Sequence, residues 1–292
     1  MSYLYLFSAV GLMSVLNILG AAFNRKQSGK QNVMPLYNFI LCGVSCLTWG
    51  IIYLFEFDFE SRVLPYSLIF GVCYAGIAIS LMKALAEGPL LLTSLLQQLS
   101  LIATAVWGFL FWGTWNAQKA PLVLSGLALV VLSLVLSLYS GKKSNKKITW
   151  KWMGYVSIVF ITTAACSIVQ KAEQIKFNGE HGGMFMFFGV LLAALICMAS
   201  FLSSEKPNVA KMLRTCWAYP VGAGLSSALG NLFVILLATT VLSPSLIYPT
   251  LAVGCLGIKL VASVFLFKER LAWWQWIGVA SGMLAVVLLS LA

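Results

Sequence analysis

The chain has 292 residues, of which 61% are hydrophobic and only 9% are charged, and its formal net charge at pH 7 is +11. A soluble domain carries roughly 25% charged residues, so this composition excludes a domain whose whole surface meets water and predicts an integral membrane protein. The positive charge does not indicate a nucleic-acid partner, because the basic residues lie in separate short loops rather than in one basic segment.

Apolar stretches follow one another along the whole chain, each close to the ~20 residues that cross ~30 Å of hydrocarbon as a helix. We predict ten transmembrane helices at 3–23, 34–55, 65–84, 90–112, 121–139, 152–171, 183–202, 217–238, 244–267 and 272–291. Strands of a membrane barrel alternate in polarity over ~10 residues, whereas these stretches are apolar on all sides. The expected fold is an all-α integral membrane protein, multi-pass in the cell membrane, with the lipid bilayer as a partner.

The Lys and Arg residues between the apolar stretches gather in alternate loops. These basic residues are Arg25, Lys26, Lys30, Lys142, Lys143, Lys146, Lys147, Lys151, Lys206, Lys211, Arg214, Lys268 and Arg270. The loop with the sequence EFDFESR is acidic instead. Loops rich in basic residues face the cytoplasm, so the pattern predicts that both ends of the chain lie outside.

Two segments of the chain indicate an internal duplication. VLSGLALVVL (Val123–Leu132) and VASGMLAVVL (Val279–Leu288) share six identities, and the same ungapped alignment pairs Phe111 with Phe267. Each segment closes a set of five predicted helices. Because five is odd, the two sets must cross the membrane in opposite directions, as in the inverted repeats of many transporters. The predicted domains are a first repeat at 1–140, a basic cytoplasmic linker at 141–151, and a second repeat at 152–292.

Three segments carry a resemblance to a known family. They are LFKERLAWWQWIGVASGMLAVVLL (Leu266–Leu289), LSPSLIYPTLAV (Leu242–Val253) and LMKALAEGPLLLTSLL (Leu81–Leu96). Together they resemble the EamA-type domain of the drug/metabolite transporter superfamily. The resemblance implies a ten-helix secondary transporter or exporter of small metabolites.

The first half departs from the family pattern in two places. Gly113 and Thr114 stand where the family has Gly-Glu, so Glu269 has no counterpart, and Thr93 stands where Pro249 would project. These departures indicate that the halves have diverged and that the second half is the more typical of the family.

Polar side chains inside the apolar stretches are the candidate substrate-binding residues. In chain order they are Asn17, Gln97, Gln98, Asn231, Tyr248 and Lys259. For the amides, contacts between helices and contact with a substrate are equal alternatives, since a buried amide needs a hydrogen-bond partner either way. Gln97 and Gln98 point about 100° apart on a helix, so one of them is expected to face the interior.

Lys259 is the most informative of these residues. A lysine at the centre of a transmembrane helix costs ~2.5–3.5 kcal/mol on insertion scales, so it usually faces a cavity or a partner. Lys259 lies eight residues before Phe267, which corresponds to ~12 Å along a helix. The alternatives are a snorkelling side chain that reaches the interface and a cation that faces the substrate, and we favour the second.

Other charged or special residues have structural alternatives. Pro249 either breaks the ninth helix and forms a gating site or simply kinks it. Lys83 and Glu87, four residues apart, are expected to form an ion pair, with a proton relay at Glu87 as the alternative. Glu269 is expected to stabilise the fold, and His181 to be solvated in a loop.

The stock of catalytic residues is too small for most enzymes. The chain has one Asp and one His, and no metal-binding, phosphate-binding or Ser/His/Asp pattern can be assembled from them. We therefore predict no enzyme, no cofactor and no metal site.

The expected function is secondary transport by alternating access, driven by an ion gradient or by exchange, with a proton or a counter-substrate as coupling partner. The segment Ser2–Phe23 carries no acid and Lys259 has no carboxylate near it in the sequence, which favours an amino acid or another carboxylate-bearing metabolite. Export is the expected direction. The alternative is an exporter of neutral or drug-like compounds.

Overall fold

The structure of the chain is a computed structural model. It describes residues 2–27, 33–111, 120–138, 149–178, 180–204, 209–238, 244–269 and 272–291. Within these ranges the regular secondary structure is helical and includes no strand. The all-α fold expected from the composition is confirmed. The predicted linker at 141–151 lies mostly outside the described residues, as do Gly113 and Thr114.

The helices begin and end close to the predicted apolar stretches. They are α1 (Ser2–Lys26), α2 (Met34–Phe55), α3 (Leu64–Glu87), α4 (Leu90–Phe111), α5 (Ala120–Leu138), α6 (Trp150–Phe177), α7 (Gly182–Leu202), α8 (Val209–Cys216), α9 (Ala218–Ala238), α10 (Pro244–Val261) and α11 (Trp273–Leu291), with a 3₁₀ turn η2 (Ser61–Val63) and a π-helical segment η4 (Ala262–Leu266). Among the described residues, α1, α2, α3, α6, α7 and α9 are long and apolar enough to span a membrane. The chain is therefore a multi-pass helical membrane protein.

Helix α6 differs from its prediction. Its N-terminus is capped by Thr149, whose side chain accepts a hydrogen bond from the backbone N–H of Trp152 at 3.2 Å. Its C-terminus lies at Phe177, where Asn178 adopts a left-handed conformation with φ of 54°. The predicted end was at 171, so the helix is longer than expected and includes Glu173.

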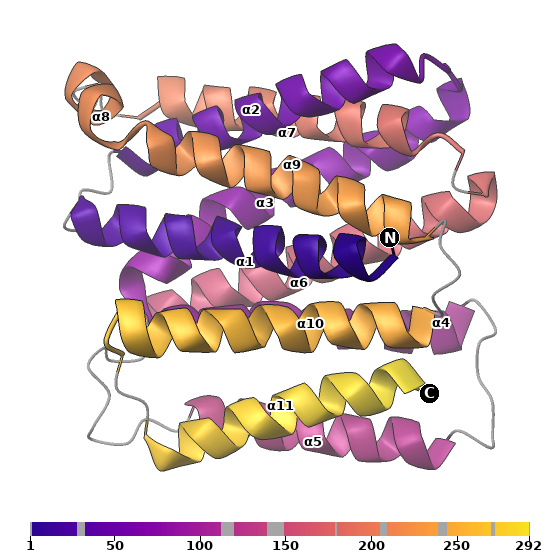
Figure 1. Cartoon of the computed structure of the whole chain (residues 1–292), viewed down its shortest axis with the longest axis vertical. Helices are drawn as coiled ribbons and strands as arrows, with labels where there is room; N and C mark the ends of the chain where they lie inside the picture. Colours follow the sequence, from indigo (N-terminus) through magenta and orange to yellow (C-terminus); the bar gives the residue numbers. More distant parts are fainter. Residues whose placement is uncertain are drawn as a thin grey trace.

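The long helices lie side by side in a stack of pairs (Figure 1). Helices α2 and α7 form one edge of the stack, and α5 and α11 form the other. Between these edges α9, α1 and α10 lie in front, in orange, indigo and yellow-orange, while α3, α6 and α4 lie behind them. Helix α1 packs on α9 and α10, α3 packs on α6 and α7, α2 packs on α7 and α9, and α4 packs on α6, α10 and α11.

The two edge pairs are antiparallel. In α2 and α7 the rings of Phe39 and Phe201 stack at 6.2 Å near one end, and those of Tyr53 and Phe187 stack at 5.5 Å near the other. In α5 and α11 the hydroxyl of Ser133, near the end of α5, donates to the carbonyl of Gly278, near the start of α11, at 2.6 Å.

Two glycines allow neighbouring helices to approach closely. A methyl group on Gly71 of α3 would lie 2.4 Å from the carbonyl oxygen of Gly189 in α7. A methyl group on Gly224 of α9 would lie 2.6 Å from the carbonyl oxygen of Leu41 in α2. Because real side chains do not approach backbone oxygens so closely, glycine is required at both positions.

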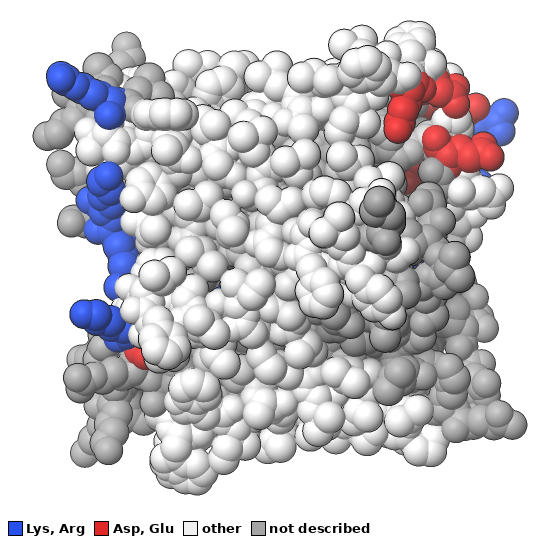
Figure 2. Space-filling model, in the orientation of Figure 1, with Lys and Arg blue, Asp and Glu red and all other residues white. Residues whose placement is uncertain are grey.

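Opposite charges mark the two ends of the bundle. Figure 2 shows several Lys and Arg side chains along the left edge, most of the visible Asp and Glu gathered at the right edge with some Lys or Arg beside them, and an uncharged band between the two edges. At the basic end Lys26 Nζ donates to the Thr215 carbonyl at 3.2 Å, so the end of α1 meets α8. At the acidic end the backbone N–H of Glu60 lies 3.4 Å from the sulfur of Met184, so the loop after α2 meets α7. The uncharged band has the character that a bilayer requires.

Candidate functional site

A polar contact joins α1 and α4 inside the apolar interior. Asn17 is 2% exposed, and its Nδ2 donates to Gln97 Oε1 at 3.0 Å and lies 3.4 Å from Ser94 Oγ. Ser94 is one helical turn before Gln97, on the same side of α4. The structure therefore brings together two of the predicted residues, and adds Ser94, which only its three-residue spacing from Gln97 could have indicated.

Gln98 does not join this contact. It is half-buried, and among the described residues no hydrogen bond to its side chain is present. Of the two adjacent glutamines only Gln97 contacts Asn17, since neighbouring residues on a helix diverge by about 100°.

The side chain of Lys259 is enclosed by the protein. The residue is only 3% exposed, and in the part of the chain that is described its ammonium makes no hydrogen bond and no ion pair. A snorkelling lysine keeps its charged group in water, so the burial of Lys259 argues against that alternative. A buried lysine whose ammonium has no hydrogen bond or ion pair among the described residues is a candidate for binding a negative group.

The rotation of α10 directs Lys259 between α1 and α4. Cys255 Sγ lies 3.5 Å from the Val10 carbonyl of α1, and Leu256 packs in one core cluster with Leu95 of α4. Lys259 lies about one helical turn after Cys255, which faces α1, and Leu256, which packs with α4. Its side chain therefore projects between α1 and α4. This is the side on which α1 and α4 make the Asn17–Gln97 contact.

Lys259 also lies at the level of that contact along the bundle. Helices α1 and α10 run in the same direction, because Cys255 lies beside Val10 and the Arg25 guanidinium stacks over the Phe267 ring at 4.7 Å. Lys259 is four residues beyond Cys255, or ~6 Å, and Asn17 is seven residues beyond Val10, or ~10 Å. The remaining offset of ~4 Å is within the span of a lysine side chain.

The end of the π-helical segment ties α10 to α4. Glu269 accepts a hydrogen bond from the Leu90 backbone N–H at 3.0 Å and another from the Ser263 hydroxyl. Because Leu90 begins α4 and Glu269 follows the end of α10, the two helices are antiparallel. A carboxylate at a helix N-terminus is stabilising, in keeping with the structural role expected for Glu269.

Asn231 makes its described contacts elsewhere. Its Nδ2 donates to the Ser227 carbonyl of its own helix at 2.8 Å. The Ser227 hydroxyl in turn lies 2.6 Å from the Tyr74 hydroxyl of α3. The structure thus places Asn231 beside a hydroxyl pair between α3 and α9 rather than in contact with Asn17 or Gln97. A tyrosine in the middle of an apolar helix was the signal for this pair.

Of the two alternatives for Pro249, the helix break is not present. Helix α10 begins at Pro244 and continues through Tyr248 and Pro249 to Val261; the side chains of these two residues lie outside the described part of the chain. One missing N–H removes one backbone hydrogen bond, which does not end a helix that continues on both sides. The departure from α geometry is the π-helical segment, where the Phe267 N–H bonds to the Ala262 carbonyl at 3.0 Å.

Two expectations about charged residues were wrong. Lys83 and Glu87, both described, do not form an ion pair; instead Lys83 Nζ lies over the Tyr155 ring at 5.5 Å, because α6 brings an aromatic ring within reach of the lysine. His181 is not solvated: its side chain is 13% exposed, and its Nδ1 lies 3.1 Å from Asp58 Oδ2.

The described residues include no group of three or more His, Cys, Asp or Glu side chains that could hold a metal ion. The arrangement around Lys259 offers one ammonium and nearby amides. Such a set binds a carboxylate or another small anion through charge-assisted hydrogen bonds.

Comparison with known proteins shows similarity at the level of the fold. No family model matches the chain, and no curated protein matches it. Twenty-two chains of solved structures are similar. One of them, described only as "Crystal structure of protein", has a TM-score of 0.58 and 14% sequence identity, with 98% of this chain and 95% of that chain covered. At this identity the likeness concerns the fold alone.

Proposed function

We propose that this chain is an EamA-type secondary transporter of the drug/metabolite transporter superfamily. It moves a small organic metabolite that bears a carboxylate or another negative group, by alternating access between two inverted five-helix repeats. The observation that carries the proposal is the buried Lys259 beside α1 and α4, whose ammonium makes no hydrogen bond or ion pair among the described residues.

The pattern of neighbouring helices supports ten spans in two related halves. We take α1, α2, α3, α4 and α5 of the first half to correspond, in that order, to α6, α7, α9, α10 and α11 of the second. Each contact between the halves should then have an equivalent contact. The contact α1–α9 is equivalent to α6–α3, α2–α9 to α7–α3, and α1–α10 to α6–α4. All of these contacts exist. The pairs α2–α7, α4–α10 and α5–α11 convert into themselves. Each of these three is antiparallel, so the axis that relates the halves runs across the helices, in the membrane plane.

The close glycine contacts support the same correspondence at the level of residues. Gly71 meets the carbonyl of Gly189 and the Cβ of Leu192, while Gly224 meets the carbonyl of Leu41 and the Cβ of Val44. The three-residue spacing within each contact is the same. The contact between α3 and α7 therefore repeats between α9 and α2.

Inverted repeats that meet at a polar site near the middle of the bundle are typical of secondary transporters. The repeat mates α4 and α10 meet in the interior and carry Gln97 and Lys259. In the proposed mechanism Lys259 binds the negative group of the substrate, and Asn17 and Gln97 hydrogen-bond its polar atoms. The site then opens to one end of the bundle at a time as the halves rock, and basic loops in the cytoplasm set the orientation.

The burial of Lys259 favours an anionic substrate over a cationic one. Two positive charges in a low-dielectric site repel strongly, whereas a carboxylate offsets the cost of burying the lysine. The second candidate, export of neutral or drug-like compounds, is supported by the Asn17–Gln97 amide pair, which can bind a neutral polar compound.

A vesicle assay with matched substrates tests the proposal. The purified protein is reconstituted in lipid vesicles and offered radiolabelled metabolites in sets that share a skeleton: an amino acid, its amide, its decarboxylated amine and the corresponding keto acid. We expect protein-dependent transport of members with a carboxylate and rates at least about tenfold lower for the amine and the amide, as the loss of a charge-assisted contact implies.

Empty vesicles, and vesicles with protein given an excess of unlabelled substrate, are the controls. Preference for the amines would overturn the assignment of an anionic substrate. Transport of none of the compounds, by protein that binds none of them, would count against the transporter assignment itself.

A further inference from the structure

A second buried charge site lies at the acidic end of the bundle. Glu173 of α6 is 1% exposed, and its Oε1 atom has no hydrogen-bond partner. An ionised carboxylate buried without a partner is very costly, whereas the neutral acid costs far less. The packing around Glu173 therefore suits a carboxyl group that carries a proton.

A histidine is linked to this part of α6 through an aromatic contact. Phe177, one turn beyond Glu173, contacts His181 edge to face with the ring centroids 5.9 Å apart. The Nδ1 atom of His181 lies 3.1 Å from Asp58 Oδ2 yet has no partner in hydrogen-bond geometry.

The exposed fraction decreases from Asp58 to His181 to Glu173. The side chain of Asp58 is 65% exposed and that of His181 is 13% exposed, while Glu173 is 1% exposed. Carboxylates and an imidazole in such a series can take up a proton from water and pass it inward.

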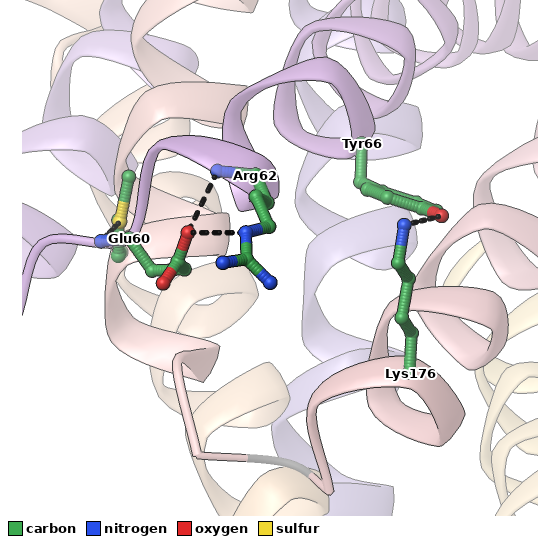
Figure 3. A network of polar contacts seen from close by, with 5 residues as sticks. Glu60, Arg62, Tyr66 and Lys176 are labelled. Atoms are coloured by element: carbon green, nitrogen blue, oxygen red, sulfur yellow. Dashed lines mark hydrogen bonds and ion pairs between the residues drawn. The ribbon is translucent and has the colours of Figure 1, made fainter.

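Three other charged groups at this end have partners (Figure 3). Glu60 Oε1 accepts from the backbone N–H of Arg62 at 3.2 Å and lies 3.5 Å from its Nε. Lys176 Nζ donates to the Tyr66 hydroxyl of α3 at 3.3 Å. Lys176, three residues beyond Glu173 on the same helix, is therefore directed toward Tyr66 of α3.

We propose that Glu173 is a proton-binding site reached from the acidic end past Asp58 and His181, and that it couples the transport cycle to the pH difference across the membrane. A proton from water binds a ring nitrogen of His181, which passes a proton to a carboxylate oxygen of Glu173. Release follows the reverse route. The coupling rests on the proposed transport function, but the proton-binding site does not.

Glu173 does not belong to the site around Lys259. Lys259 lies ~12 Å before Phe267, which follows the π-helical segment at the basic end, and Glu173 lies ~6 Å from the acidic end of α6, a helix ~42 Å long. The two groups are thus separated by on the order of 20 Å along the bundle. One small metabolite cannot contact both, so Glu173 takes a different ligand, and a proton fits an enclosed carboxyl group.

Infrared difference spectroscopy of the reconstituted protein tests the proton site without any substrate. At pH 7 we expect a carboxylic-acid C=O band that is absent in the Glu173→Gln variant. The band should be retained in the control variant Glu180→Gln, because Glu180 is an exposed carboxylate in the loop that follows α6. After a pH jump, the rate at which this band changes should be at least about tenfold lower in the His181→Gln variant than in wild type, because a proton-transfer group has been lost. Identical bands in wild type and Glu173→Gln would overturn the site.

Transport at imposed pH gradients tests the coupling. With a metabolite that the wild type carries, Glu173→Gln should lose gradient-driven accumulation by roughly 5- to 150-fold, the usual range of coupling between sites. Exchange at equal pH should stay within about twofold of wild type, because the Lys259 site is intact. Unchanged gradient-driven accumulation in Glu173→Gln would overturn the coupling. If no compound is transported while the infrared band behaves as expected, the proton site stands and the transport function fails.

Discussion

If the two halves are related as proposed, they contribute differently to the two sides of the bundle. Around α2 and α7 the halves contribute equivalent groups: aromatic pairs stack at both ends of the interface, and glycine meets a backbone carbonyl on each flank. Around α4 and α10 the halves contribute different groups. The alignment that pairs Phe111 with Phe267 sets Gln97 against Val253, and Lys259 against Ala103.

This difference separates packing from chemistry. Close helix contacts tolerate little change in shape, so both halves retain them around α2 and α7. In the proposed transporter a single substrate in the middle of a two-fold arrangement is itself asymmetric and gains from different groups on its two sides. The proposal therefore accounts for the different polar residues of α4 and α10.

The largest expected effect is on the packed side. Gly71→Ala and Gly224→Ala should each lower the free energy of unfolding by about 1–3 kcal/mol, because the added methyl group meets a backbone oxygen that cannot move alone. Thermal unfolding in detergent measures the loss. Gly154→Ala and Gly257→Ala are matched controls, since nothing lies within 4 Å of either added methyl group. A gain in stability in Gly71→Ala or Gly224→Ala, like that expected in the controls, would contradict the close contacts.

A smaller effect is expected on the polar side. Gln97→Ala removes the acceptor of the buried Asn17 amide and should cost about 1–2 kcal/mol, the range measured for interhelical hydrogen bonds in model membrane peptides. Thermal unfolding is again the measurement. Gln98→Ala is the control, because Gln97 and not Gln98 contacts Asn17. The free energy of unfolding of Gln98→Ala should stay within about 0.5 kcal/mol of the wild-type value. Equal losses in the two variants would mean that α4 is rotated differently.

The effect of removing the Glu269 contact between α4 and α10 should be smaller still. Glu269→Gln keeps the shape of the side chain but removes its charge from the N-terminus of α4, which should cost about 0.3–1 kcal/mol. The loss should shrink at high salt. Glu87→Gln, at a carboxyl group for which no hydrogen bond is described, should leave the unfolding temperature unchanged. A stability of Glu269→Gln equal to wild type at low salt would remove the proposed tie between α4 and α10.

The orientation of the bundle in the membrane can be measured with variants that leave stability unchanged. Single cysteines at the exposed positions Ser61 and Ser203 should leave stability within about 0.5 kcal/mol of wild type. In intact cells an impermeant maleimide should label the cysteine at 61 directly, and the cysteine at 203 only after permeabilisation, because basic loops face the cytoplasm. Wild-type protein gives the background from the native cysteines. The opposite labelling would invert the orientation.

The sequence predicts the helices well because each apolar stretch is bounded by polar or helix-ending residues. It also singles out Lys259, since no other lysine or arginine lies within the middle of a predicted span. It does not predict the Asn17–Gln97 contact, which depends on how α1 and α4 are rotated against each other across 80 residues of chain. Nor does it predict the burial of Glu173, because the cap at Asn178, and not hydropathy, sets the end of α6.

The most direct test of the central claim is transport by Lys259→Met and Lys259→Arg in vesicles, with a carboxylate that the wild type carries. Lys259→Met should fold as well as wild type or slightly better, since an apolar residue suits the interior. Its transport rate should nevertheless fall about tenfold or more, because a charge pair that is largely desolvated is worth on the order of 2 kcal/mol or above. Lys259→Arg should be intermediate, since its planar group binds with different geometry. Wild-type rates in Lys259→Met would contradict the assignment of Lys259 to the substrate.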